Sequence, residues 1–305
     1  MEILWKLLSL LVPLALGYVL KKKHFFGNLD YQVLAKITLN ITLPAAVICS
    51  FGSFTLEYSL LGIVLLAFLA NWAPLLVSLL TTRRDRENPK LRGLKMICAS
   101  SFNMGNFLIP FVQQFLGGSG LALASLFDSG NTVMATGGVY IFTAGAVKVP
   151  GEKKMTLGDV FQKLMRSVTI PTYLILVVLA LFGIRPPEAL VTVAEPTGNA
   201  NAFVSMFMIG LMFEIRFEKS YVGTALGILL RKYACALVLA FLFYFCLPFD
   251  QLTRQVLVMS VFAPVPSIAS VYVEQLGGDV GLASFTTSLS FLISCGIMVL
   301  LMVIL

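Results

Sequence analysis

The sequence predicts an all-α polytopic membrane protein whose ten transmembrane helices form a 5+5 inverted repeat. Of its 305 residues, 58% are hydrophobic and only 12% are charged, a balance that the surface of a soluble domain does not tolerate. The basic residues fall in every second connection, and two interrupted apolar segments stand at corresponding places in the two halves. Such paired interruptions indicate a binding site at the bilayer midplane.

The span count follows from the length of the apolar stretches. One helix needs ~20 apolar residues to cross a bilayer core of ~30 Å. We expect spans at residues 3–20, 34–51, 60–80, 94–116, 121–142, 164–182, 189–213, 230–247, 252–275 and 280–305.

The positions of the Lys and Arg residues set the predicted orientation. The first, third, fifth and seventh connections, with the adjoining helix ends, hold all of them except Lys6, Arg185 and Arg254. The positive-inside rule therefore places these connections in the cytoplasm and both termini outside the cell membrane. Arg231 and Lys232 are assigned to the seventh connection, so no cationic side chain is expected at mid-membrane. Topology alone explains the net charge of +7, and we expect no nucleic-acid partner.

An internal repeat is readable at a shift of 160 residues. QFLGG at 114–118 closes the fourth span and EQLGG at 274–278 closes the ninth, and the shift superposes Met104 and Asn106 on Pro264 and Pro266. Five spans per half is an odd number, so the second half enters the membrane from the opposite side. The predicted division is a first repeat at 1–143, a polar cytoplasmic linker at 144–163 and an inverted second repeat at 164–305.

The two interrupted segments are the candidate substrate site. Proline removes a backbone N–H and glycine loosens a helix, so a break is expected near the middle of each segment. Freed backbone groups and half-helix N-termini would attract an anion there. The alternatives are amides that join helices and kinks without a ligand. The residues are Asn103, Gly105, Asn106 and Pro110 in the first segment and Pro264 and Pro266 in the second.

Asp128 is the candidate for coupling to an ion or a proton. If its span starts near Leu121, a rise of ~1.5 Å per residue puts Asp128 roughly 11 Å deep, toward the middle of the ~30 Å core. Asn131 and Thr132 follow at helical spacing on the same face. The stripe predicts cation or proton binding, with Asn131 beside the substrate. The alternative is a carboxylate that caps a kink or pairs with a lysine.

Other chemistry has little support in the sequence. The five cysteines stand singly in apolar spans, and His24 in a basic loop is the single histidine. These residues predict no disulfide framework, metal cluster or catalytic triad. We therefore expect neither an enzyme nor a cofactor, apart from a coupling Na⁺ or H⁺, which the sequence leaves open. The remaining amides of the spans are expected to pack between helices, namely Asn40, Asn71, Asn199 and Asn201.

Several motifs resemble the auxin efflux carrier family, whose bacterial members include malonate-permease-like proteins. They are NMGNFLIP at 103–110, LFDSGN at 126–131, GVY at 138–140, Ala263-Pro264, and GGD at 277–279. The resemblance implies a ten-helix inverted repeat similar to that of sodium/bile-acid symporters, with helices four and nine crossing at their prolines beside the substrate. It also implies a homodimer contact through helices one, two, six and seven.

The expected function is secondary transport of a small organic anion by alternating access. The substrate implied by the resemblance is a carboxylate, such as malonate or an auxin-like acid. The alternative is a membrane receptor or scaffold that keeps the fold and binds a ligand without moving it.

Overall fold

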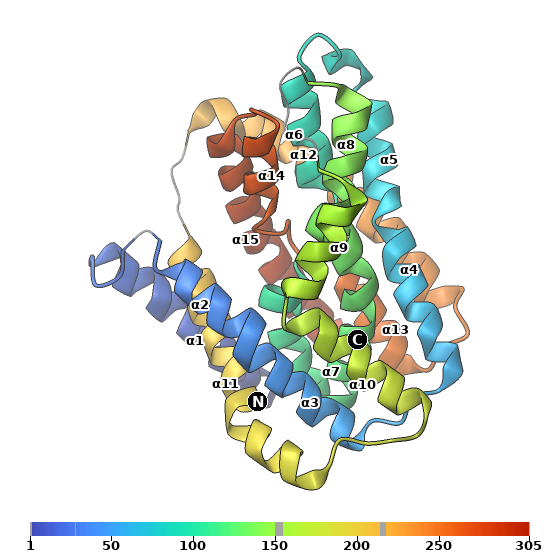
Figure 1. Cartoon of the computed structure of the whole chain (residues 1–305). Helices are drawn as coiled ribbons and strands as arrows, with labels where there is room; N and C mark the ends of the chain where they lie inside the picture. The colour runs from blue at the N-terminus through green and yellow to red at the C-terminus, as the bar shows by residue number, and fades with distance from the viewer. Residues whose placement is uncertain (1, 28, 150–154, 214–217, 305) are drawn as a thin grey trace.

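The computed structural model describes residues 2–27, 29–149, 155–213 and 218–304. Within these ranges, the regular secondary structure is entirely helical. Figure 1 shows the arrangement of the helices. The α-helices are α1 (Glu2–Lys22), α2 (Tyr31–Ile37), α3 (Leu43–Ser53), α4 (Gly62–Ala70), α5 (Trp72–Thr81), α6 (Pro89–Ala99), α7 (Ile109–Val133), α8 (Val139–Val147), α9 (Leu157–Arg166), α10 (Thr169–Leu181), α11 (Glu188–Met212), α12 (Lys219–Phe245), α13 (Gln251–Val261), α14 (Ala269–Gln275) and α15 (Val280–Ile304). Short π-helical segments, Thr38–Thr42, Met104–Leu108 and Met134–Gly138, join α2 to α3 and lie at either end of α7.

The chain is a multi-pass membrane protein. In the described ranges, five helical stretches are long and apolar enough to cross a bilayer, and the pair α9 and α10, bent by 79°, brings the number to six. Ten separate spans are not seen by this measure, because α6 and α13 are each interrupted after 11 residues. One 44-residue stretch, Met104–Val147, also runs through Gly117, whose φ of 67° breaks the helix.

The helices form two groups that meet along α7. In the first group, α1, α2 and α3 pack on α11, and α10 packs on α3. In the second group, α4 and α13 pack on α7, α12 packs on α13 and α15, and α6 packs on α8. The groups touch where α3, α10 and α11 contact α7. Figure 1 shows α3, α10 and α11 in the lower part of the view, with α5, α6 and α8 at the top.

Both predicted breaks are present, but the first lies before Pro110 and not at it. The chain leaves helical geometry at residues 100–103, where Ser101 has a φ of 65°, and again between α13 and α14. Pro110 does not break its helix as expected. It is the second residue of α7, directly after the π-helical segment Met104–Leu108, so the helix runs through it and the break lies before Met104.

The predicted polar linker also differs from expectation. Helix α8 continues to Val147 and α9 begins at Leu157, so both ends of the 144–163 segment are helical. Residues 150–154, with Pro150 and Gly151, lie outside the described part of the chain.

Glycines let several helices touch backbone to backbone. A Cβ on Gly17 of α1 would lie 2.3 Å from the carbonyl oxygen of Phe207, and one on Gly210 of α11 would lie 2.1 Å from that of Leu14. Both separations are shorter than any real contact, so only glycine permits this crossing. Gly130 of α7 meets α4 in the same way, since its Cβ would lie 2.0 Å from the Val64 carbonyl oxygen.

Gly210→Ala is expected to destabilise the protein by about 1–3 kcal/mol, because the added methyl group forces α1 away from α11. Thermal unfolding in detergent measures the loss. Gly227→Ala in α12 is the matched control, since its Cβ meets nothing within 4 Å, and it should be neutral or stabilising by about 0.5–1 kcal/mol. Equal melting temperatures for the two variants would contradict the packing argument.

Candidate functional site

The two broken segments cross and bond directly to each other. The backbone N–H of Asn103, in the first break, donates to the carbonyl oxygen of Pro264, in the second, at 3.0 Å. The prediction that these segments face each other is confirmed at the level of geometry. Each break leaves backbone groups without a helical partner, and this hydrogen bond satisfies one such group in each segment. A membrane interior requires such pairing, because it offers no water to these groups.

Asn131 holds the first break from the side of α7. Its Oδ1 accepts from the N–H of Phe102 at 3.2 Å, and its Nδ2 donates to the carbonyl oxygen of Phe102 at 2.9 Å. The side-chain amide thus bonds to both the N–H and the carbonyl oxygen of Phe102, which have no helical partners in the break. The same Nδ2 also donates to Oδ1 of Asp128 at 3.2 Å.

Asp128 is buried, with 6% of its surface exposed, and accepts hydrogen bonds from three side chains. Thr132 donates to Oδ1 at 3.1 Å, as Asn131 does, and the Tyr173 hydroxyl donates to Oδ2 at 3.1 Å. The predicted stripe on one face of the helix is confirmed. Within the described residues no Lys or Arg forms an ion pair with Asp128. Sequence reasoning missed Tyr173, which comes from α10, 45 residues further along the chain.

Lys232 is the largest correction to the sequence analysis. It does not lie in a cytoplasmic connection but in the middle of α12, with 1% of its surface exposed. Its Nζ donates to the carbonyl oxygen of Ser101 at 2.7 Å and lies 4.6 Å from the centre of the Phe102 ring. The signal was in the sequence, because the apolar run at 221–230 extends the helix well before Lys232. A buried ammonium thus touches one end of the break, and Asn131 holds the next residue.

Side chains of α15 and α12 hold the second break. The hydroxyl of Ser290 accepts from the N–H of Val265 at 3.0 Å, and that of Ser294 donates to the carbonyl oxygen of Phe262 at 2.7 Å. The Tyr233 hydroxyl pairs with Ser294 Oγ at 2.8 Å and donates to the Ser290 carbonyl oxygen at 3.0 Å. None of these residues was predicted, because single serines in apolar spans carry little signal.

A cavity of about 340 Å³ opens beside the crossing, between the two helix groups. The first group contributes Ala35, Leu39 and Ile170, and α9 contributes Lys163 and Leu164. Six of the predicted site residues line it: Asn103, Gly105, Asn106, Asp128, Asn131 and Pro266. Pro264 lies behind them, where its carbonyl oxygen joins the two breaks, and Pro110 is buried away from the cavity.

Two amide atoms in this lining lack a partner among the described residues. They are Nδ2 of Asn103, a donor, and Oδ1 of Asn106, an acceptor. Asn103 is 6% exposed. Buried polar groups are nearly always hydrogen-bonded, so each orphan needs an explanation. Both atoms are buried, so a molecule in the cavity would reach them only after the side chains turn.

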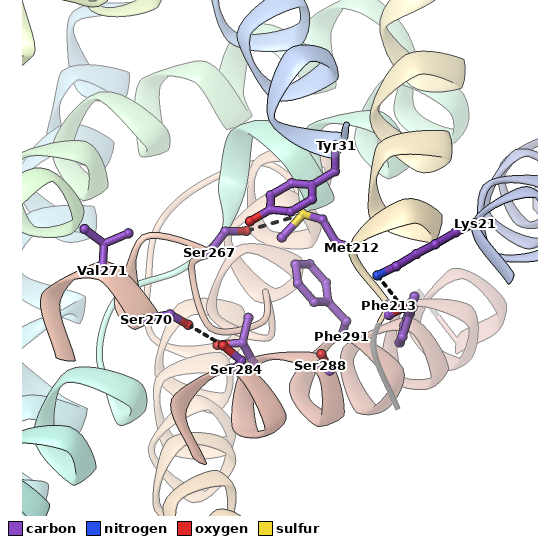
Figure 2. A pocket seen from close by; sticks show the side chains of 11 residues that line it. Lys21, Tyr31, Met212, Phe213, Ser267, Ser270, Val271, Ser284, Ser288 and Phe291 are labelled. Carbon is purple, nitrogen blue, oxygen red and sulfur yellow. Dashed lines mark hydrogen bonds between the residues drawn. The ribbon is translucent and has the colours of Figure 1, made fainter. Parts of the chain in front are cut away.

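A smaller cavity of about 160 Å³ lies on the other side of Ser267, which lines both cavities. Figure 2 shows its hydroxyl groups, among them Ser270 and Ser284, which are 3.3 Å apart, below the ring of Tyr31. Lys21 stands at its edge and donates to the carbonyl oxygen of Phe213 at 3.2 Å. Polar surface thus continues from the crossing along the N-terminal end of α14.

Of the four remaining amides, Asn201 joins helices as predicted, whereas Asn40 is exposed and the amides of Asn40 and Asn71 bond within their own helical stretches. Asn40 and Asn71 donate to carbonyl oxygens of their own helices at 2.9 and 2.7 Å. Asn201 of α11 accepts from Thr42 at 3.0 Å and donates to Gln113 of α7 at 3.4 Å, so it joins the two helix groups. Asn199 lines a separate cavity of about 220 Å³.

Comparison with known proteins adds one distant relative. The chain is 24% identical to a protein of Methanothermobacter thermautotrophicus named as an uncharacterized transporter, over 294 residues that cover 94% of this chain and 93% of the relative. No family model matches the sequence.

Asn131→Ala is expected to destabilise the fold by about 2–5 kcal/mol, because both backbone groups of Phe102 lose their partner. The free energy of unfolding in detergent measures it. Asn40→Ala is the control, since that exposed amide bonds only within its own helix, and it should change stability by less than about 0.5 kcal/mol. A small effect at both positions would mean that Asn131 does not hold the break.

Proposed function

We propose that the protein is a secondary transporter that moves a small organic anion across the cell membrane by alternating access. The observation that carries the proposal is the cavity beside the contact between two broken helices, which is mainly apolar and is lined by Asn103, Asp128 and Asn131. Discontinuous helices that meet near mid-membrane are the usual framework of transporter sites. The name of the archaeal relative supports the same reading, and we infer that the chain belongs with carriers of the auxin efflux type.

The charge and shape of the cavity favour a carboxylate. The helical segment that starts at Met104 and the helix α14 both begin beside the cavity, so their positive ends face it. Lys163 adds the one cationic side chain among the described lining residues, and Asn103 offers a free donor. A volume of about 340 Å³ suits a small molecule. We propose a substrate of the malonate or auxin-like acid class.

The positions of helix ends support the ten-span inverted repeat. Gly117 and Gly277, which differ by 160 in number, both have positive φ, 67° and 66°. Helix α13 corresponds to α6 at an offset of 162 residues, and the break after Val261 corresponds to the break after Ala99 at that same offset. The proposed halves are residues 1–143 and 164–305, joined by the 144–163 linker, with both termini on the extracytoplasmic side.

Access to the site would alternate as one helix group moves against the other. The cavity opens toward Lys163 and Leu164 of α9, on the side that the positive-inside rule assigns to the cytoplasm. Beyond the crossing, Gln113 of α7 closes against α11 by donating to the Gly198 carbonyl oxygen at 3.1 Å and accepting from Asn201. This polar contact would open when the cavity closes. The outer face of the first group would carry the homodimer contact.

Asp128 is proposed to bind the coupling cation or proton. Its two oxygens collect three donors beside the cavity, and the Lys232 side chain donates to the Ser101 carbonyl oxygen in the same break. Asn131 donates both to the Asp128 carboxylate and to the Phe102 carbonyl oxygen in the break, so a change of charge at Asp128 would be transmitted to the break through Asn131.

Proteoliposomes that contain the purified protein are expected to take up labelled malonate or a related dicarboxylate faster than empty vesicles, with a rate that saturates. The reason is the cavity that lies between the two helix groups and is lined by Asn103, Asp128 and Asn131. Binding of the acid without flux under any imposed gradient would favour a receptor and overturn the transporter proposal.

Asp128→Asn is expected to lower the flux at least about tenfold, equivalent to about 1.4 kcal/mol, and to remove its dependence on the driving cation or proton. Uptake under an imposed pH or Na⁺ gradient measures both. Asp250→Asn is the control, because Asp250 is exposed at the start of α13 and caps it with no side-chain hydrogen bond. Unchanged flux and ion dependence in Asp128→Asn would return Asp128 to a structural role.

A further inference from the structure

Helix α9 is a short amphipathic helix that the proposed transport mechanism does not account for. It runs from Leu157 to Arg166 and starts with a capping box, in which Thr156 and Asp159 bond to each other's backbone N–H. Its axis is bent by 79° from that of α10, a segment of the membrane-embedded part of the chain. At this angle α9 does not continue the direction of α10, and its amphipathic sequence suits a helix that lies along the membrane surface.

Only part of the apolar face of α9 packs against the protein. Val160 is buried against Gly137, where a Cβ would come within 2.4 Å of the valine side chain, and Leu164 lines the cavity. Leu157, Phe161 and Met165, one turn apart, are 76%, 64% and 40% exposed. In water such a stripe would be unfavourable, whereas an amphipathic helix in the headgroup layer buries it in the acyl chains.

The charges around this stripe are mainly basic. Lys163 and Arg166 lie in the last turn of α9. Asp159, the acidic residue of the helix, is engaged in the capping box. Clusters of Lys and Arg beside a membrane attract anionic lipid headgroups, by about 1 kcal/mol each.

We propose that α9 docks on an anionic membrane leaflet, with Leu157, Phe161 and Met165 in the acyl-chain boundary and Arg166 on lipid phosphates. The docking would bear on the cavity, because α9 is joined to α10 of the first helix group and packs on the Met134–Gly138 segment of the second. Lys163 also lies 5.6 Å from the centre of the Tyr272 ring. Lipid bound to α9 would therefore restrict the edge of the cavity where the two helix groups meet.

The test places a fluorophore on the stripe. In a background in which the two native tryptophans, Trp5 and Trp72, are replaced by Phe, Phe161→Trp is reconstituted into phosphatidylcholine vesicles with and without phosphatidylglycerol. Lipids brominated near the headgroup should quench Trp emission at least about twofold more strongly than in the matched variant Gln162→Trp, which stands on the polar side. Phosphatidylglycerol should raise the quenching, and Arg166→Glu should abolish that increase.

Each other outcome overturns the proposal. Quenching of Phe161→Trp by aqueous acrylamide and not by bromolipid would place α9 in water. Shielding from both quenchers would mean that protein, such as a second copy of the chain, covers the stripe. Bromolipid quenching that ignores phosphatidylglycerol would remove the anionic headgroup from the assignment. None of these readouts involves flux, so the result is independent of whether the protein transports.

Discussion

The hydrogen bond between the backbone of Asn103 and that of Pro264 is the contact on which the rest of the structure depends. Each helix break releases N–H and carbonyl groups in an interior that offers no bulk water, and every such group must find a partner within the protein. Asn131 and Lys232 hold the first break, and Ser290 and Ser294 hold the second. These partners come from α7, α12 and α15, and the cavity lies beside the two breaks, where α9 and α10 contribute to its lining.

The sequence alone predicted the features that depend on local chemistry. Proline and glycine at the centre of an apolar segment indicated the breaks, and helical spacing placed Asn131 on the face of Asp128. It failed for Lys232, because the assignment of basic residues to connections presumed that a charge marks a helix end. The partners Tyr173 and Ser290 were missed for another reason. They reach the site through tertiary packing, and no spacing in one sequence encodes which distant helix comes close.

The two charged groups at the first break have unlike environments. The Asp128 carboxylate is surrounded by hydroxyl and amide donors and borders the cavity, where a small cation or a proton can reach it. The Lys232 ammonium is enclosed by protein, on a carbonyl oxygen and an aromatic face. Asp128 thus borders the cavity, whereas Lys232 is shielded from it by protein.

The glycine contacts are unevenly distributed in the molecule. Gly17 and Gly210 join α1 to α11, Gly198 joins α11 to α3, and Gly130 joins α7 to α4, and each of these contacts lies inside one helix group. Between the groups, the contacts described above are made by side chains such as Gln113 and Asn201, which can change rotamers at low cost. The closest backbone contacts thus lie inside each group, and a movement of one group against the other would have to rearrange side chains, including those of the apolar core that α3, α10 and α11 share with α7.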